Sequence, residues 1–141
     1  MNDKPKVGVG FGVMLLNNRK QVLLGRKNTE SDQGTWTMPG GNFEFGESFE
    51  DGAARKTREE TSININIDKL KIISLSNDVT SNAHYVTVGF LSTDFSGEAK
   101  VMEPDEITNW KWFDLDTLPQ PMFKPSQEVI DNFLVNKLYQ K

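Results

Sequence analysis

Two adjacent carboxylates, Glu59 and Glu60, are the side chains of this sequence whose types and spacing best suit chemistry. Arg55 precedes them by four and five positions, and a glycine pair that includes Gly41 lies further upstream. Hard divalent cations such as Mg²⁺ prefer oxygen ligands, commonly one or two carboxylates completed by water and substrate phosphates. A cation bound by this pair would neutralise a polyphosphate and position a water molecule for attack on phosphorus. The spacing therefore indicates metal-assisted hydrolysis of a diphosphate bond.

A helix is expected to carry these carboxylates. Ser48 is suited to the N-cap position, and Glu50 and Asp51 suit the positive end of the helix dipole. Residues 53–60 contain no helix breaker. Because successive helical residues are about 100° apart, a single face is expected to hold Gly52, Lys56, Glu59 and Glu60. Arg55, four residues before Glu59, is expected to orient its carboxylate.

Residues 40–63, GGNFEFGESFEDGAARKTREETSI, resemble the Nudix box, GX5EX7REUXEEXGU, in which U is a bulky aliphatic residue. The matching positions are Gly41, Glu47, Arg55, Glu59 and Glu60. The strings TWTMPGGNFEFGESFEDGAAR, AHYVTVGF and EPDEITNWKWFDLDTLPQPMF are together similar to the MutT-like branch, which hydrolyses nucleoside triphosphates, including oxidised ones. The resemblance implies an α/β/α sandwich with a mixed β-sheet and a Mg²⁺-dependent nucleotide pyrophosphohydrolase that releases a nucleoside monophosphate and pyrophosphate.

The resemblance also implies roles for individual residues. Four form the expected catalytic group: Glu47, Arg55, Glu59 and Glu60. Mg²⁺, with Mn²⁺ as an alternative, is expected at Gly41 (through its carbonyl), Glu59, Glu60 and Glu103. Glu103 is preferred to Glu106 because its EP[DE] context before a WxW pair is similar to that of small nucleotide-cleaning Nudix proteins, although EPDE could instead be a solvated acidic loop. The expected substrate contacts are Arg26 and Lys56, and from their apolar character Trp36 and Met38, which could stack on a nucleobase. The open alternatives are a plain surface arginine at Arg26 and core positions for Trp36 and Met38.

Three positions depart from the box. Lys56 stands where the family has glutamate, Thr57 where it has an aliphatic residue, and Ser62 where it has the final glycine. Thr57 and Ser62 concern helix packing and the turn after the helix. Lys56 matters more, because it places a cation beside the expected metal site. Two readings stay open: the lysine pairs with Glu60 and weakens metal binding, or it contacts a substrate phosphate.

Strand patterns mixed with two helices favour a sheet covered by helices. Strands are expected at residues 7–16, 22–26, 36–38, 70–79, 85–94 and 107–113, and a short extended segment at 62–68. The first two strands are expected to form a hairpin whose turn places Asn17 and Asn18 at positive φ. Apolar residues at helical spacing predict a C-terminal amphipathic helix over 126–138.

Composition limits the class of protein. The 141 residues are expected to form one domain, 1–141, and a net charge of -4 argues against binding nucleic acid by bulk charge. The absence of cysteine excludes thiolate metal sites and a Cys nucleophile. No apolar run reaches the roughly 20 residues of a membrane span, and the N-terminus lacks a signal-peptide pattern, so a cytoplasmic protein is expected. A homodimer is expected only by similarity to relatives.

Several alternatives remain. The charged helix could be a solvated face stabilised by ion pairs alone. The chain could retain a nucleotide pocket but hydrolyse poorly because of Lys56, or it could cleave another nucleoside or isoprenyl diphosphate. The single histidine, His84, is assigned no role. Further aromatic pocket candidates, which could equally be core residues, are Phe11, Trp110 and Phe123.

Overall fold

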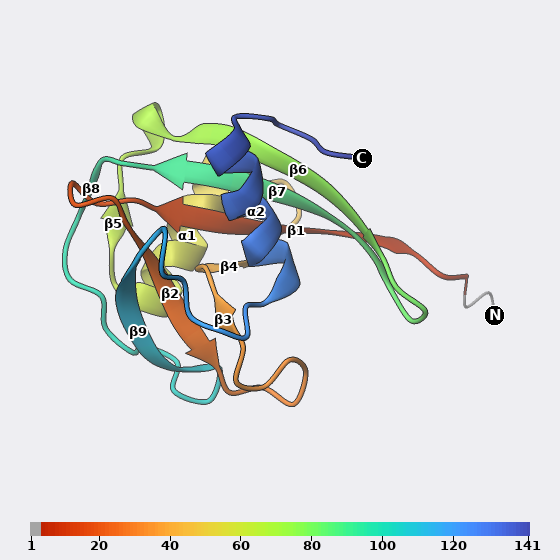
Figure 1. Ribbon diagram of the computed structural model, residues 1–141. Helices are drawn as coiled ribbons and strands as arrows, with labels where there is room; N and C mark the ends of the chain where they lie inside the picture. Colours follow the sequence, from red (N-terminus) through yellow and green to blue (C-terminus); the bar gives the residue numbers. More distant parts are fainter. Residues whose placement is uncertain (1–3) are drawn as a thin grey trace.

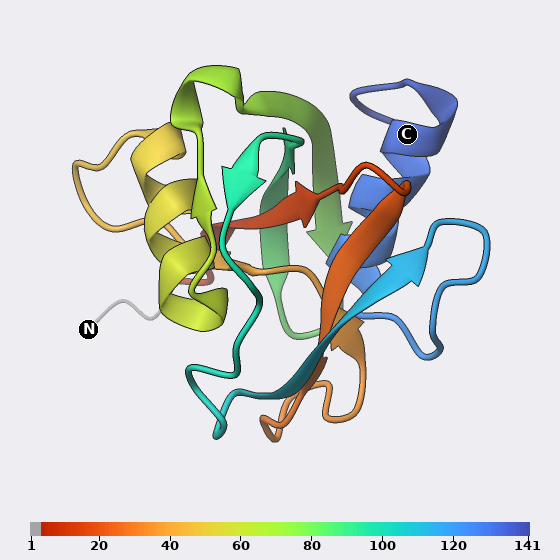
Figure 2. The same cartoon turned by 90° about the vertical axis from the view of Figure 1, so that its left-hand side faces the viewer.

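The computed structural model describes residues 4–141 and contains a mixed sheet between two α-helices (Figures 1 and 2). The strands are β1 (Val7–Leu15), β2 (Gln21–Lys27), β3 (Trp36–Thr37), β4 (Gly40–Asn42), β5 (Asn64–Ile65), β6 (Lys71–Val79), β7 (His84–Ser92), β8 (Phe95–Ser96) and β9 (Ile107–Asp114). The helices are α1 (Phe49–Thr61), a 3-10 turn (Ile67–Lys69) and α2 (Lys124–Val135). No helix among these residues is long and apolar enough to cross a membrane.

The larger sheet has the strand order β4-β1-β7-β6, and a smaller one has the order β3-β2-β9. β1 runs parallel to β7 and antiparallel to β4, while β7 and β6 are antiparallel. Figure 2 shows α1 and α2 on opposite sides of the larger sheet. The expected sandwich with a mixed sheet is therefore confirmed.

Alternation along β1 divides the core in two. Phe11, Val13 and Leu15 face the cluster that includes Ala53 of α1. Met14 and Leu16 face the other cluster, which contains Val129 and Ile130 of α2. Because successive strand residues point to opposite faces, one apolar strand serves both helical layers. The continuously apolar end of β1 reflects burial on both sides.

The hairpin expected between the first two strands is wrong. β1 and β2 belong to different sheets and share only the isolated bridge between Leu16 and Val22. Both edges of β1 are already occupied, by β4 and β7, so β2 turns away and pairs with β3 and β9. In the connecting turn Lys20, rather than Asn17 or Asn18, has a positive φ of 62°.

Helix boundaries follow local capping. The Ser48 Oγ accepts a hydrogen bond from the Asp51 N–H at 3.0 Å, so α1 begins where expected. Ser62 ends α1 in the left-handed region with φ of 70°, a conformation that glycine adopts more easily. α2 begins two residues before the expected 126 and ends at Val135, because Asn136 is left-handed. Residues beyond it, including Leu138, form a tail rather than helix.

The tail lies against an edge of the larger sheet. The Leu75 N–H of β6 donates to the Leu138 carbonyl at 2.8 Å. The Asn132 side chain of α2 donates to the same carbonyl at 3.2 Å and to Ser74 Oγ at 2.7 Å. The Gln140 side chain in turn donates to Asn132 Oδ1 at 2.7 Å. One buried asparagine thus ties the tail to both helix and strand.

Candidate functional site

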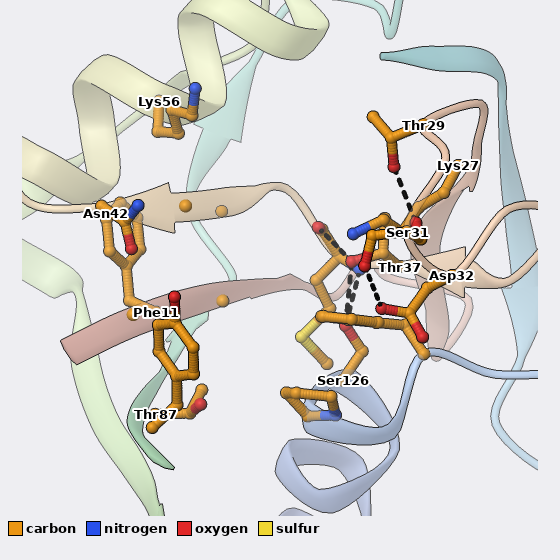
Figure 3. A pocket seen from close by; sticks show the side chains of 18 of the residues that line it. Phe11, Lys27, Thr29, Ser31, Asp32, Thr37, Asn42, Lys56, Thr87 and Ser126 are labelled. Atoms are coloured by element: carbon orange, nitrogen blue, oxygen red, sulfur yellow. Dashed lines mark hydrogen bonds between the residues drawn. The ribbon is translucent and has the colours of Figure 1, made fainter. Parts of the chain in front are cut away.

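An open cleft of about 1120 Å³ lies over one end of the larger sheet, between α1 and the first turn of α2 (Figure 3). Its floor includes four glycines, Gly10, Gly12, Gly40 and Gly41. Its walls come from α1, the β2–β3 loop, the β6–β7 hairpin, the turn before β9 and the start of α2. Segments from the whole length of the chain therefore meet around one cavity.

The floor needs glycine because two backbones approach closely. A side-chain carbon at Gly40 would overlap the carbonyl oxygen of Phe11, so only glycine lets β4 lie this close to β1. A side-chain carbon at Gly41 would lie 2.7 Å from Cε of Lys56. The glycine pair thus makes space on one side for strand pairing and on the other for the lysine.

Arg55 joins three segments of the Nudix-like motif. Its Nε and Nη2 donate to the two carboxylate oxygens of Glu47, at 3.0 and 2.7 Å. Its Nη1 donates to Glu59 Oε1 at 2.8 Å, and its Nη2 also reaches the Asn42 carbonyl at 3.1 Å. The Arg55 guanidinium, helped by the Glu44 N–H, lowers the pKa of Glu47 to about 2. Bonding to Glu47 and Glu59 in turn raises the pKa of Arg55, so the group stays fully charged.

Glu60 lies on the cleft side of α1, half-buried beneath the glycine turn. Its Oε1 accepts a hydrogen bond from the Gly40 N–H at 2.8 Å, and its backbone carbonyl accepts one from the Trp110 indole at 3.1 Å. Burial raises the pKa of Glu60 to about 7, and the charges of Glu103 and Glu106 add to the shift, against the opposing effects of Gly40 and Lys56. A bound cation would relieve this accumulated negative charge.

The carboxylates at this end of the cleft fit a divalent cation. Glu60, Glu103 and Glu106 all line it. Across residues 4–141 no three or more acidic, histidine or cysteine side chains already converge as a ligand cage. Mg²⁺ commonly takes only one or two protein carboxylates and fills its remaining positions with water and phosphate oxygens. Glu60 with Glu103 or Glu106 would suffice for that mode of binding.

The structure brings some of the sequence-predicted residues to the cleft and leaves others outside it. The expected site residues that line the cleft are Met38, Gly41, Arg55, Lys56, Glu60 and Glu103, joined by the aromatic candidates Phe11 and Phe123. Within the described chain, the expected residues outside the lining are Arg26, Trp36, Glu47 and Glu59, together with the aromatic candidate Trp110. The roles expected for these side chains stay predictions. His84, for which no role is expected, also lies outside the lining.

Physical reasons account for the residues left outside. Glu59 is exposed and held by Arg55, although it neighbours Glu60 in sequence. Trp36 packs edge-on against Phe113, with ring centroids 5.0 Å apart, and both rings border the core cluster that contains Val129 and Ile130 of α2. Arg26 is exposed, while the next residue, Lys27, reaches the cleft.

Lys27 is a cleft residue that sequence reasoning missed. Its Nζ lies 4.1 Å from the ring centroid of Phe123, a cation–π contact that joins β2 to the start of α2. β2 contains a register shift between Gly25 and Lys27. Simple alternation along the strand does not reveal that shift, so nothing in the sequence pattern indicates that Lys27 lines the cleft; the substrate contact expected for Arg26 stays a prediction.

A second pair of acids, Asp78 and Glu128, lies where α2 packs on β6; Asp78 lines the cleft there and Glu128 does not. Asp78 of β6 is 9% exposed, and Lys124 Nζ lies 3.8 Å from its Oδ1. Burial, then the neighbouring Asp78, raises the pKa of Glu128 on α2 to about 7. Glu128 Oε1 is buried without a hydrogen-bond partner among the described residues. The cleft therefore has carboxylates at both ends and cations beside each group.

This arrangement suits binding of an elongated anion. Arg55 and Lys56 line the α1 end together with Glu60, whereas Lys27 and Lys124 line the α2 end. Between them the floor is glycine backbone and the apolar side chain of Met38. A phosphate chain would meet cations and metal-binding oxygens at the first end, with room for an organic group toward the second.

Comparison with known proteins agrees with this geometry. Residues 6–133 match the NUDIX domain family. The chain is 26% identical over 117 residues to the ADP-ribose pyrophosphatase of Methanocaldococcus jannaschii, covering 83% of this chain and 68% of that protein. It is 25% identical over 136 residues to an RNA pyrophosphohydrolase of Erythrobacter litoralis, covering 84% and 82% respectively.

Solved structures agree as well. The crystal structure of a MutT NUDIX hydrolase from Burkholderia pseudomallei matches with a TM-score of 0.84 and 27% identity, covering 90% of this chain and 98% of that one. Hydrolases of this family use divalent metal cations, which the carboxylates of the α1 end fit. Together with the glycine turn, the Arg55 cluster and Glu60, the match over residues 6–133 shows that the chain belongs to the Nudix family of hydrolases.

Proposed function

We propose that this protein hydrolyses a nucleoside triphosphate to a nucleoside monophosphate and pyrophosphate, with Mg²⁺ as the cofactor and Mn²⁺ as an alternative. The observation that carries the proposal is the position of Glu60, half-buried at the cleft beside two further carboxylates and below the Gly40–Gly41 turn. Such a site accommodates a cation and a phosphate chain together. An oxidised or pyrimidine deoxynucleotide is the proposed substrate.

The residues around the cleft would have two roles, metal binding and positioning of the metal-binding groups. Glu60, with Glu103 or Glu106 and the Gly41 carbonyl, would hold the metal. That cation would supply charge neutralisation and a more acidic water. The Gly40 N–H keeps the Glu60 carboxylate oriented toward the glycine turn, at 2.8 Å. Arg55 holds Glu47 and Glu59 in place and so fixes the turn against α1. In the overall reaction, water adds to phosphorus as the bond to the departing pyrophosphate oxygen breaks.

The nucleoside would occupy the part of the cleft away from α1. Phe123 lies at its border beneath Lys27, and Met38, which is 3% exposed and part of the core, backs the floor. Asp78 and Thr87 line the same region and could bond to polar edges of a base. These contacts support a nucleotide but do not select among bases.

A nucleotide panel tests the proposal. Purified protein is incubated with each of the common and oxidised nucleoside triphosphates and Mg²⁺, while pyrophosphate and monophosphate are measured. We expect metal-dependent release of both products, and a loss of about a hundredfold or more in kcat for Glu60→Gln. Glu50→Gln, an exposed change in the first turn of the same helix, is the matched control and should retain full activity. The proposal fails if no nucleotide is turned over with metal present.

The relatives suggest another substrate class to include. One is an ADP-ribose pyrophosphatase and another an RNA pyrophosphohydrolase, so ADP-ribose and 5′-triphosphorylated RNA belong in the same panel. Turnover of either in preference to free nucleotides would keep the diphosphate chemistry but change the substrate. The alternative of a nucleotide-binding module rests on Lys56, since a cation there could reduce metal affinity. Calorimetry showing nucleotide binding without turnover would favour it.

By similarity to the family we also propose a homodimer. Equilibrium sedimentation would give the assembled mass directly.

A further inference from the structure

Lys56 occupies the cleft side of α1, one helical turn before Glu60. It is half-buried and lines the cleft beside the glycine turn. Its methylene chain lies over Gly41: a side-chain carbon added at Gly41 would come within 2.7 Å of Lys56 Cε and 3.5 Å of Cδ. Figure 3 shows Lys56 above β4, at the α1 end of the cleft. Because Gly41 has no side chain, the Lys56 stem packs against its backbone, and the Lys56 ammonium is placed at the α1 end of the cleft.

The charge of Lys56 is not matched by the protein. Among residues 4–141 its Nζ makes no hydrogen bond and no ion pair within 4.0 Å, in contrast to Arg55, which meets Glu44, Glu47 and Glu59. Lys56 precedes Glu60 by four residues on α1 and its charge lowers the pKa of Glu60, but among the described residues the two side chains form no ion pair within 4.0 Å. The interpretation in which Lys56 forms an ion pair with Glu60 is therefore not supported by a contact between the two side chains.

The exchange of acid for base changes the charge of the site by a definite amount. A glutamate at this box position would bring one negative charge, whereas Lys56 brings one positive charge. The difference is two units, which equals the charge of one divalent cation. A phosphate chain that needs a given neutralisation at this end of the cleft can therefore be bound with one divalent cation fewer.

We propose that the Lys56 ammonium binds a substrate phosphate directly and takes the place of one divalent cation. The ammonium offers three N–H donors on a flexible stem, which suits phosphate oxygens. The ligand class is a pyrophosphate group, whether free or within a nucleotide. This inference rests on the proposed phosphate-binding cleft. It also predicts that pyrophosphate binds in the absence of metal, and the proposed hydrolysis does not depend on such metal-free binding.

The first test is calorimetric titration with inorganic pyrophosphate in EDTA. The wild-type protein should bind it, and Lys56→Met, which keeps the stem and removes the charge, should weaken the affinity by about tenfold or more. Lys111→Met, at an exposed position on β9, is the matched control and should bind as the wild type does. Thermal melts show that each variant is folded. Equal affinity of Lys56→Met and wild type, or no binding by wild type, overturns the proposal.

The second test counts metal ions. Mn²⁺ titration followed by electron paramagnetic resonance, with a non-hydrolysable nucleotide present, should show one more bound Mn²⁺ in Lys56→Glu than in the wild type. An unchanged count overturns the exchange of lysine for metal.

The two proposals fail separately. Metal-free pyrophosphate binding that depends on Lys56, in a protein without turnover on any nucleotide, leaves the inference standing and removes the proposed activity. Nucleotide turnover in a protein whose pyrophosphate affinity does not depend on Lys56 supports the proposed activity and overturns the inference about Lys56.

Discussion

Arg55 is the residue on which the order of the site depends most. Its planar guanidinium bonds in two places to Glu47 while it also reaches Glu59 and the Asn42 carbonyl. These partners come from the turn before α1, from α1 itself and from the end of β4. A single side chain therefore holds the glycine turn against the helix that carries Glu60.

Replacing Arg55 with Lys should loosen this cluster, because an ammonium cannot reproduce the forked contact. We expect Arg55→Lys to lower the free energy of unfolding by about 1–2 kcal/mol and to reduce hydrolysis more than tenfold. Urea unfolding and steady-state kinetics measure the two effects. Arg58→Lys, at an exposed site on the same helix, should change neither. Equal behaviour of the two variants would show that charge alone suffices at position 55.

Thr57 shows a different relation between residue and fold. Its side chain is fully buried, and among the described residues its hydroxyl has no hydrogen-bond partner. Thr57→Val keeps the shape and removes the unpaired group, so we expect a gain of about 1 kcal/mol in thermal or urea unfolding. Thr61→Val is the matched contrast: its hydroxyl bonds to the Thr57 carbonyl at 2.7 Å and to the Ile63 N–H at 3.1 Å, so stability should fall. A loss of stability in Thr57→Val would contradict the account.

At the scale of elements, the contact of β4 with β1 creates the floor of the cleft. β4 is three residues long, yet it brings the Gly40 N–H to Glu60 and the Gly41 backbone beneath Lys56. The strand remains in place because Gly40 and Gly12 are paired in register. The site thus depends on a pairing too short to be recognised as a strand from hydrophobic alternation.

Gly40→Ala tests that dependence. The added methyl group would overlap the Phe11 carbonyl, and backbone on both sides leaves no easy relaxation. We expect a loss of about 3 kcal/mol or more of stability, measured by urea unfolding. Gly10→Ala, where the new carbon would lie 3.4 Å from the Gly41 carbonyl, should cost distinctly less. Comparable losses at the two positions would mean that the strands can separate without difficulty.

Sequence reasoning succeeded where the signal is local. The capped helix with Ser48, and the Arg55–Glu59 pairing, are present as expected. It failed on the hairpin of β1 and β2, because strand partners depend on which edges other strands have already occupied. Which of the two adjacent glutamates lines the cleft could not be predicted either, because helical spacing groups Glu59 with Glu60. The hydrogen bond to Arg55 holds Glu59 outside the cleft, whereas the bond from the Gly40 N–H holds Glu60 inside it.

At the scale of the whole molecule, the pairing of Glu128 with Asp78 depends on how α2 packs on the sheet. Glu128 belongs to α2 and Asp78 to β6, so these two carboxyl groups are close only when the helix is docked. Ionising both is unfavourable in the folded protein. Docking of α2 is therefore linked to proton binding.

This linkage has a definite sign. Glu128 has a pKa of about 7 in the fold against an ordinary value of 4.5, so the folded state holds more protons between these values. Its contribution to stability is present below pH 4.5 and is lost as the pH rises toward 7. Glu128→Gln should therefore gain stability over wild type from pH 5 to pH 8, by about 1 kcal/mol after allowance for solvent screening of a partly buried group. Urea unfolding across that range measures it, with Glu30→Gln as an exposed control; a difference that does not grow with pH would contradict the linkage.

The contact between the tail and β6 bears on how an open edge of the larger sheet is covered. β6 is the last strand of its sheet, and an open strand edge is a template on which another chain can add. The Leu138 carbonyl occupies the Leu75 N–H of that edge, and Asn132 and Gln140 hold the tail there. The segment after α2 thus covers part of that edge, and removing it should leave the Leu75 N–H open to pairing with another chain.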